Sequence, residues 1–258
     1  MQVLHMSGAG NDFMVVDARE LSLDFSSAAR TLCAKTGADG FMALDYSELA
    51  DFKLHFYNSD GHRGEMCGNG ARCICRFASE LGIAGDTMTV ETDAGLVPGW
   101  RLDDGQYRVQ LNSPSVIDFS RKDGCAYVEL GNPGIPHCVQ EIPALSWTQA
   151  DELRNYARAL RYDPAFPKGV NVNFYTWLNE TSIRILTYER YVEDYTLACG
   201  TGCGSVATVL FAQGKLPGGM LTAHNKGGIL RLQVSGREGK VDTLFLDGPT
   251  EILAYYEV

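Results

Sequence analysis

Two short stretches of this sequence resemble each other: MCGNGARC at residues 66–73 and ACGTGCGS at residues 198–205. Each contains a Cys-Gly-polar-Gly motif. The leading cysteines, Cys67 and Cys199, are separated by about half of the 258-residue chain. This spacing predicts a duplicated fold in which each half of the chain carries one copy of the motif.

The residues around the two motifs support the duplication because similar patterns recur at matched offsets. The alternating runs FKLHFYN (52–58) and IRILTYER (183–190) both predict strands, and each ends the same number of residues before its cysteine. Strand-forming runs also follow both motifs, TMTVETDAGLV in the first half and MLTAHNKGGIL in the second. Near its end, each half has a strand-forming run that is followed by a proline, YRVQLNSP (107–114) in the first half and DTLFLDGP (242–249) in the second.

Each half also predicts two helices. The earlier ones lie in residues 25–37, with Ser26 as the expected N-cap and Gly37 as the stop, and in residues 146–164. The later ones begin at the two cysteine motifs. In the first half Ile74, Phe77 and Ala78 form an apolar face, with Arg72 expected on the opposite side. The equivalent helix in the second half is apolar nearly all round, which predicts a buried central helix.

These patterns predict an α/β (α+β) fold of two pseudo-symmetric, strand-rich domains. Each domain is expected to have a mixed or antiparallel sheet wrapped round a central helix, with the active site in the cleft between them. We place the domains at residues 1–117 and 118–258, where SPSVIDFSRKDG is typical of a polar connection. Residues 250–258 are expected to pack back on the first domain.

The composition and charge of the chain argue against several classes of function. The net charge of −10 and pI of about 4.9 argue against nucleic acid or an anionic membrane as a partner. No apolar run approaches the length of a membrane span, and the N-terminus lacks the pattern of a signal peptide, so we expect a cytoplasmic protein. No Cys-x-x-Cys pair supports a structural zinc site, and no metal is expected. Six of the eight cysteines are interpreted as small buried apolar residues: Cys33, Cys73, Cys75, Cys125, Cys138 and Cys203.

Cys67 and Cys199 differ from these six because each stands at the predicted N-terminus of a helix. Free backbone N–H groups and the positive end of the helix dipole favour a bound anion there. The same field is expected to lower the pKa of a thiol. Pseudo-twofold packing would set one thiol on each side of a bound anion, which is the arrangement that a racemase or epimerase needs. The competing interpretation is that both are buried structural thiols.

The motifs MCGNGARC, LACGTG, GAGNDF, GNP, NVNF and YER, in their order along the chain, resemble those of the diaminopimelate epimerase family. The resemblance covers about residues 3 to 250. It implies an epimerase that needs no pyridoxal phosphate or other cofactor and inverts one α-carbon of diaminopimelate in lysine and cell-wall biosynthesis. It also implies a small-molecule amino-acid substrate and a homodimer.

The resemblance also implies roles for individual residues. Cys67 and Cys199 would be the acid–base pair, supported by His137 and Glu189. Backbone N–H groups of Gly68, Asn69, Gly200 and Thr201 would hold the reacting carboxylate. The rest of the substrate would be bound by Arg190 on the distal carboxylate, by Glu189 on the distal ammonium, and by the carboxamides of Asn11, Asn58, Asn132 and Asn171.

Some residues depart from the family pattern. Gly134-Ile135-Pro136 separates GNP from HCV, Tyr191 follows Glu189-Arg190, and Tyr195 replaces a Glu. These changes keep a second hypothesis open, an enzyme of the same fold that racemises another amino acid such as histidine. A third hypothesis is a non-catalytic dithiol protein with a redox or metal-binding role. Turn chemistry is the alternative interpretation for the asparagines, an exposed ion pair for Glu189-Arg190, and a packed core histidine for His137.

Overall fold

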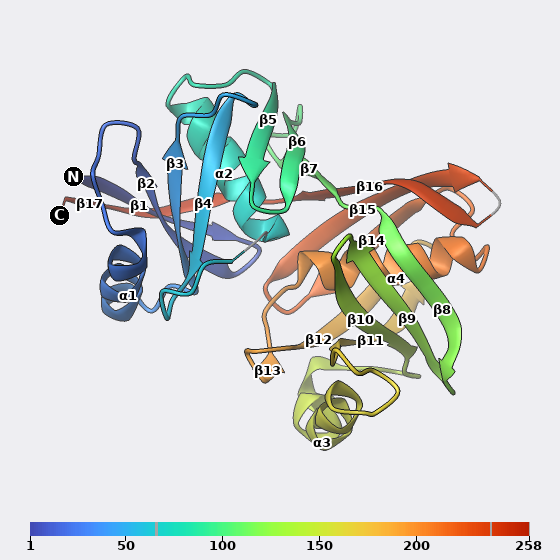
Figure 1. The fold of residues 1–258 in the computed structure, drawn as a ribbon. Helices are drawn as coiled ribbons and strands as arrows, with labels where there is room; N and C mark the ends of the chain where they lie inside the picture. The colour runs from blue at the N-terminus through green and yellow to red at the C-terminus, as the bar shows by residue number, and fades with distance from the viewer. Residues whose placement is uncertain (65–66, 238, 258) are drawn as a thin grey trace. The chain divides into compact units, whose positions relative to one another are not determined.

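A computed structural model describes residues 1–64, 67–237 and 239–257 (Figure 1). The chain divides into two compact units. Unit 1 comprises Met1–Gln110 and Asp247–Val258, and unit 2 comprises Leu111–Leu246. No helix among the described residues is long and apolar enough to cross a membrane.

Unit 1 is a mixed sheet with two helices. In chain order its elements are β1 (Gln2–Gly8), β2 (Asn11–Asp17), α1 (Phe25–Thr36), β3 (Gly40–Asp45), β4 (Phe52–Asn58), α2 (Gly68–Glu80), β5 (Thr87–Thr92), β6 (Gly95–Arg101), β7 (Tyr107–Leu111) and β17 (Glu251–Glu257). The chain termini lie side by side because β17 pairs antiparallel with β1 (Figure 1). The last strand of the chain is thus part of the unit that the first residues form.

Unit 2 repeats this plan. Its elements are β8 (Pro114–Lys122), β9 (Cys125–Gly131), β10 (Gly134–Glu141), the short 3₁₀ helix η1 (Trp147–Gln149), α3 (Ala150–Arg161), β11 (Asn171–Asn179), β12 (Ser182–Glu189), β13 (Asp194–Tyr195), α4 (Gly200–Ala212), β14 (Met220–Asn225) and β15 (Gly228–Arg237). Strand β16 (Lys240–Gly248) runs from unit 2 into unit 1.

The strand pairings confirm the predicted duplication. In unit 1, β17–β1 and β1–β2 are antiparallel, β2–β3 parallel, β3–β4 antiparallel, β4–β5 parallel and β5–β6 antiparallel. In unit 2, β8–β9–β10–β11–β12–β14–β15 follows the same sequence of directions. The helices α1 and α3, and α2 and α4, occupy equivalent connections. The α/β (α+β) fold class predicted from the sequence is therefore correct.

Each unit has one helix at its centre. The strands β1, β2, β3, β5 and β6 surround α2, and β9, β10, β11, β14 and β15 surround α4. Nearly every residue of α4 is buried from Gly200 to Leu210, as its apolar sequence predicted. Packing on all sides fixes the direction of both helices, so the N-termini that carry Cys67 and Cys199 have defined positions within their own units.

Three local predictions are wrong. The N-cap of α1 is Asp24, two residues before Ser26; its carboxylate accepts from the amides of Ser26 and Ser27 and so takes the capping role in place of the Ser26 hydroxyl. Arg72 is fully buried rather than on a polar face, because the sheet encloses α2. The stretch predicted as a polar connection forms β8, whose apolar and β-branched residues pair with β9.

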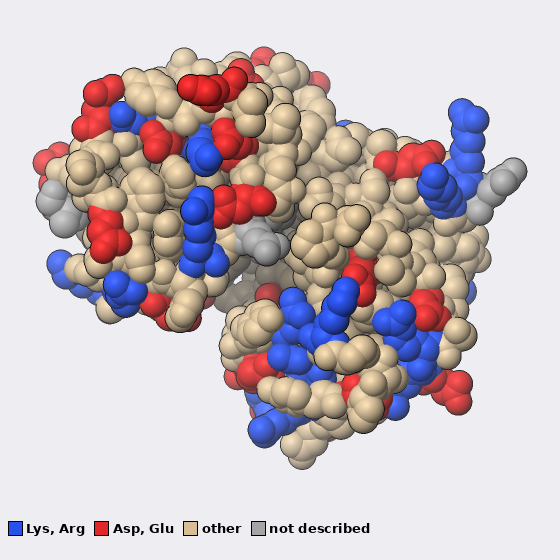
Figure 2. Space-filling model, in the orientation of Figure 1, with Lys and Arg blue, Asp and Glu red and all other residues tan. Residues whose placement is uncertain are grey.

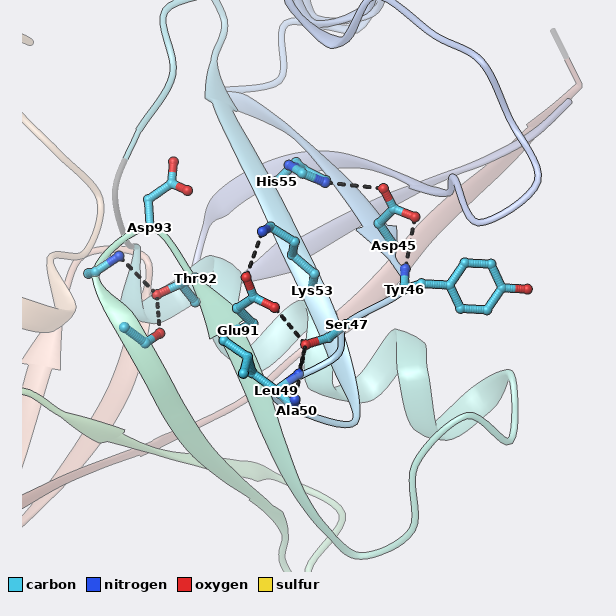
Figure 3. A network of polar contacts seen from close by, with 12 residues as sticks. Asp45, Tyr46, Ser47, Leu49, Ala50, Lys53, His55, Glu91, Thr92 and Asp93 are labelled. Atoms are coloured by element: carbon cyan, nitrogen blue, oxygen red, sulfur yellow. Dashed lines mark hydrogen bonds and ion pairs between the residues drawn. The ribbon is translucent and has the colours of Figure 1, made fainter.

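Polar side chains join neighbouring strands of unit 1 on its outer surface (Figure 3). The Lys53 ammonium of β4 donates to Glu91 of β5 at 2.6 Å, and the Ser47 hydroxyl donates to the other Glu91 oxygen at 2.6 Å. His55 contacts Asp45 of β3 at 3.2 Å. These partly exposed contacts link strands that also share a ladder, and their place in the fold indicates a structural role.

Candidate functional site

The first cysteine motif forms a cluster at the N-terminus of α2 in unit 1. Cys67 is the N-cap, with extended backbone angles, and it is partly exposed. Its thiol lies 3.6 Å from the Asn11 carboxamide oxygen, and the Asn69 side chain donates to the same oxygen at 3.5 Å. The Asn11 amide nitrogen donates to Asp39 at 2.5 Å. The fold thus brings Cys67, Gly68, Asn69 and Asn11 together.

Buried Arg72 supports this cluster from inside the helix. Its guanidinium donates to the Gly68 carbonyl at 3.2 Å and to the Asn69 side-chain oxygen at 3.1 Å. The backbone of Gly8 also lies close, because a Cβ there would be only 2.9 Å from the Asn69 carbonyl oxygen. Strand β1 and helix α2 therefore approach as closely as backbones can, and the first turn of α2 is held from two sides.

The second motif forms the equivalent cluster at the N-terminus of α4 in unit 2. Cys199 is the N-cap and is buried. Its sulfur accepts the backbone N–H of Gly202 at 3.3 Å and lies 3.5 Å from the Thr201 hydroxyl. Both motifs therefore begin helices at their cysteines, as the sequence predicts.

Burial decides the charge state of Cys199. It raises the thiol pKa well above its usual value, and the negative charge of Glu189 raises the pKa further. The hydrogen bonds from Thr201 and Gly202 act in the opposite direction but are weaker. The Gly202 N–H at the helix N-terminus lowers the pKa of Cys199 as expected, but desolvation outweighs it and the net shift is upward. Cys199 is a neutral thiol, able to donate a proton.

Glu189 is the last residue of β12, and Arg190 follows it. The Glu189 carboxylate accepts a 2.6 Å hydrogen bond from the Thr196 hydroxyl. The backbone N–H of Arg190 donates to the Asn171 side chain at 2.8 Å, and its guanidinium donates to the Lys168 carbonyl at 3.0 Å. Asn171 starts β11 and is nearly buried. Unit 2 thus brings Cys199, Glu189, Arg190 and Asn171 into one region.

His137 lies on β10, directly beside Asn171 in the parallel ladder, and is completely buried. Its Nδ1 is 3.2 Å from the Asn173 amide nitrogen, while its Nε2 has no hydrogen-bond partner among the residues that the structure describes. Burial, and after it the charge of Arg190, lowers the pKa of His137 to about 3. The imidazole is therefore neutral, and its unpartnered nitrogen makes it more than a fully satisfied core histidine.

Asn58 and Asn132 are less connected. Asn58 ends β4 and is exposed, and its backbone N–H donates to the His62 carbonyl at 2.9 Å. Asn132 is exposed in the turn between β9 and β10 and precedes a cis peptide bond to Pro133. Among the residues that the structure describes, no side-chain hydrogen bond joins either of them to the cysteine clusters.

Asn173 and Thr187 also belong to this region of unit 2, although the sequence motifs did not single them out. Asn173 is completely buried, donates to the Cys138 carbonyl at 2.9 Å, and accepts from the Thr187 hydroxyl at 3.1 Å. Its side chain lies against Gly202, where a Cβ would be 2.3 Å from the Asn173 oxygen. The NVNF pattern contained the signal, since alternation along a strand places Asn171 and Asn173 on the same face.

Comparisons with solved structures agree with this architecture. A *Bacillus anthracis* phenazine biosynthesis protein of the PhzF family superposes with a TM-score of 0.73 at 15% identity, over 100% of this chain and 98% of that one. A probable proline racemase from *Agrobacterium radiobacter* K84 gives 0.73 at 17% identity, over 100% and 92%. The fold is thus that of the two-unit PhzF and proline racemase-like proteins.

Sequence relatives identify the family. The diaminopimelate epimerase family model matches residues 3–117 and 130–252. The diaminopimelate epimerase of *Aquifex aeolicus* is 36% identical over 91% of this chain and 90% of its own, and that of *Chlorobaculum tepidum* is 34% identical over 95% and 96%. The chain belongs to the diaminopimelate epimerase family, and it is an isomerase of the epimerase class.

Proposed function

We propose that this protein interconverts LL- and meso-diaminopimelate by moving a proton at one α-carbon. One observation carries the proposal: two units of the same strand order each bear a cysteine as the N-cap of their central helix. A duplicated thiol suits a reaction that needs one proton acceptor and one proton donor. In this role the protein would supply lysine and cell-wall biosynthesis and would require no cofactor.

In the proposed mechanism Cys67 and Cys199 act on opposite faces of the α-carbon. One sulfur, as thiolate, takes the α-proton while the other, as thiol, delivers a proton to the opposite face. The high pKa of Cys199 supports its role as the donor in one direction. After each turnover the two sulfurs have exchanged protonation states, and proton exchange with solvent restores them.

The carbanion formed at the α-carbon needs stabilisation of the adjacent carboxylate. The backbone N–H groups of Gly68, Asn69, Gly200 and Thr201 begin α2 and α4 and are suited to hold it. These donors are fixed by buried helices, so they need little reorganisation as charge develops. The Arg72 contacts to Gly68 and Asn69 support this role in unit 1.

The distal end of the substrate is a second amino-acid head group. We assign its carboxylate to Arg190 and its ammonium to Glu189, with the carboxamides of Asn11, Asn58, Asn132 and Asn171 completing the site. Hydrogen bonds already hold the Arg190 backbone to Asn171 and the Glu189 carboxylate to Thr196. His137, neutral and with an unpartnered nitrogen, is assigned a supporting role.

Hydrogen–deuterium exchange tests the proposal. Purified protein in D₂O with a reducing agent, and without added pyridoxal phosphate or metal, should introduce deuterium at the α-carbon of LL- or meso-diaminopimelate. Cys67→Ala and Cys199→Ala should each abolish epimerisation. Cys33→Ala is a matched control, because this thiol lies on α1, is buried in the core of unit 1 and takes no part in the mechanism. Retention of epimerisation by either of the first two variants would refute the mechanism.

A substrate panel separates diaminopimelate from the other amino acids that a related racemase could use. Lysine, glutamate, histidine and proline each lack part of the distal head group. Without it, Arg190 or Glu189 would not meet the substrate group of opposite charge that it is proposed to bind, which is costly. We therefore expect exchange with diaminopimelate to exceed exchange with the others by at least about tenfold. Faster exchange with histidine would favour the alternative racemase.

We further propose a cytoplasmic homodimer. The outer strand β17 supports it, because Leu253 and Tyr255 are 48% and 63% exposed on a strand that extends the sheet of unit 1. Sedimentation analysis should give twice the mass of the chain, and Tyr255→Asp should shift the protein toward the monomer. A monomeric wild-type protein at micromolar concentration would contradict the dimer.

A further inference from the structure

The turn after β12 contains a bulky residue in an unfavourable backbone conformation. Tyr191 has a φ of 74°, in the left-handed region that favours glycine. This conformation is unfavourable for a residue with a Cβ, because the Cβ then crowds the following carbonyl oxygen. Its side chain is 82% exposed, so core packing does not offset the strain. A strained and exposed aromatic residue next to a proposed substrate-binding arginine suggests a functional role.

Neighbouring groups hold the turn in place. The backbone N–H of Tyr191 donates to the Glu193 carboxylate at 3.3 Å, and the Glu193 N–H donates to the Glu189 carbonyl at 2.9 Å. Arg161 anchors the same carboxylate through its Nε at 3.1 Å and its Nη2 at 3.0 Å. The conformation of Tyr191 therefore follows from contacts on both sides of it.

The ring of Tyr191 is placed against Arg190. The guanidinium carbon lies 4.7 Å from the ring centroid, within the range of a cation–π contact. On another side, the Arg190 Nη1 donates to the Lys168 carbonyl at 3.0 Å. The ring and the carbonyl together restrict a side chain that would otherwise sample several rotamers. An arginine stacked on a ring still presents N–H groups at its edges, where a carboxylate binds.

We propose that Tyr191 is a positioning residue that holds the Arg190 guanidinium ready for the distal carboxylate of the substrate. The inference rests on the proposed function, in which Arg190 binds that carboxylate. A restricted arginine loses less conformational freedom when the substrate binds, so removal of the ring weakens binding. The chemical step, at the other end of the substrate, keeps its rate.

Three variants separate the ring from the backbone. Tyr191→Phe keeps the ring and should keep the wild-type KM for diaminopimelate. Tyr191→Asn removes the ring but suits the left-handed region, and it should raise KM about two- to tenfold with kcat within twofold. Tyr191→Gly should do the same. Tyr46→Asn is the matched control, because Tyr46 is also exposed and lies beside an arginine, Arg19, in unit 1; its KM should not change.

The outcomes distinguish the two proposals. If the wild-type protein does not exchange the α-hydrogen of diaminopimelate, the proposed function fails and the role of Tyr191 fails with it. If the wild type is active but Tyr191→Asn has the wild-type KM, only the role of Tyr191 fails. An equal rise in KM for Tyr191→Phe also overturns it. A purely structural role predicts lower thermal stability and a fall in kcat for Tyr191→Asn, whereas positioning predicts that stability does not fall, because Asn suits the left-handed region.

Discussion

The backbone N–H of Gly202 donates to the sulfur of Cys199 at 3.3 Å, at a point where no larger residue fits. A Cβ on Gly202 would lie 2.3 Å from the Asn173 oxygen and 2.9 Å from the Thr187 hydroxyl. Both neighbours are buried and hydrogen bonded to each other, so neither can move away cheaply. The first turn of α4 therefore depends on this glycine.

We expect Gly202→Ala to destabilise the protein by about 1–3 kcal/mol through overpacking. It should also reduce epimerisation at least about tenfold, because the displaced helix start carries Cys199. Thermal unfolding and proton-exchange rates provide the measurements. Gly218→Ala is the control, since nothing lies within 4 Å of a Cβ at that position. Equal behaviour of the two variants would show that the start of α4 tolerates the extra methyl group.

Glu189 provides a prediction about the thiol of Cys199. Its negative charge raises the Cys199 pKa, second only to burial. Glu189→Gln keeps the shape and the contact with Thr196 but removes the charge, so the Cys199 pKa should fall. The rate of alkylation of Cys199 should then rise at a lower pH than in the wild-type protein, as followed by mass spectrometry. An unchanged alkylation profile would mean that the carboxylate does not act on this thiol.

Much of the fold was predictable because the two halves of a duplicated sequence can be compared, and a pattern that recurs in both supports the same element in each. The strand runs before Cys67 and Cys199 correspond to β4 and β12, and the helices begin at the cysteines. Local competition explains the errors. Asp24 and Ser26 are both residue types that cap helices well. Strand β8 has a mixture of polar and apolar residues, because many of its side chains are partly exposed.

The candidate site was less predictable because its electrostatics depend on three-dimensional burial. The sequence placed Cys199 at a helix N-terminus but did not reveal that desolvation raises its pKa. The helical spacing predicted that Arg72 lies on an exposed face, and only the sheet that encloses α2 shows that it is buried. Asn173 and Thr187 come from different strands, and only the β11–β12 pairing brings them together.

His137 gives a prediction about stability and pH. Its pKa falls from about 6.5 when unfolded to about 3 when folded, because burial disfavours the charged ring. Between these values the unfolded state binds the extra proton, so stability is complete above about pH 6.5 and declines as the pH falls. The slope due to this residue approaches roughly 1.4 kcal/mol per pH unit.

Chemical denaturation of wild-type protein and of His137→Gln at several pH values measures this contribution. The difference in unfolding free energy between them should shrink as the pH falls from 7 toward 4. Other groups titrate equally in both proteins and cancel in the difference. A constant difference between the two proteins would mean that the His137 imidazole binds its proton as readily in the folded state as in the unfolded state.

Oxidation tests whether Cys67 and Cys199 can act on the same carbon. Two sulfurs that act on one α-carbon from opposite faces should be able to form a disulfide when a thiol oxidant such as diamide removes two electrons and two protons from the pair. We expect peptide mapping to find a Cys67–Cys199 link, loss of epimerisation in proportion to that link, and recovery with a reducing agent. Cys125 and Cys138 are the internal comparison, because both thiols are buried in the same hydrophobic cluster of unit 2. Oxidised protein that contains only a Cys125–Cys138 link and retains full activity would count against the two-thiol mechanism.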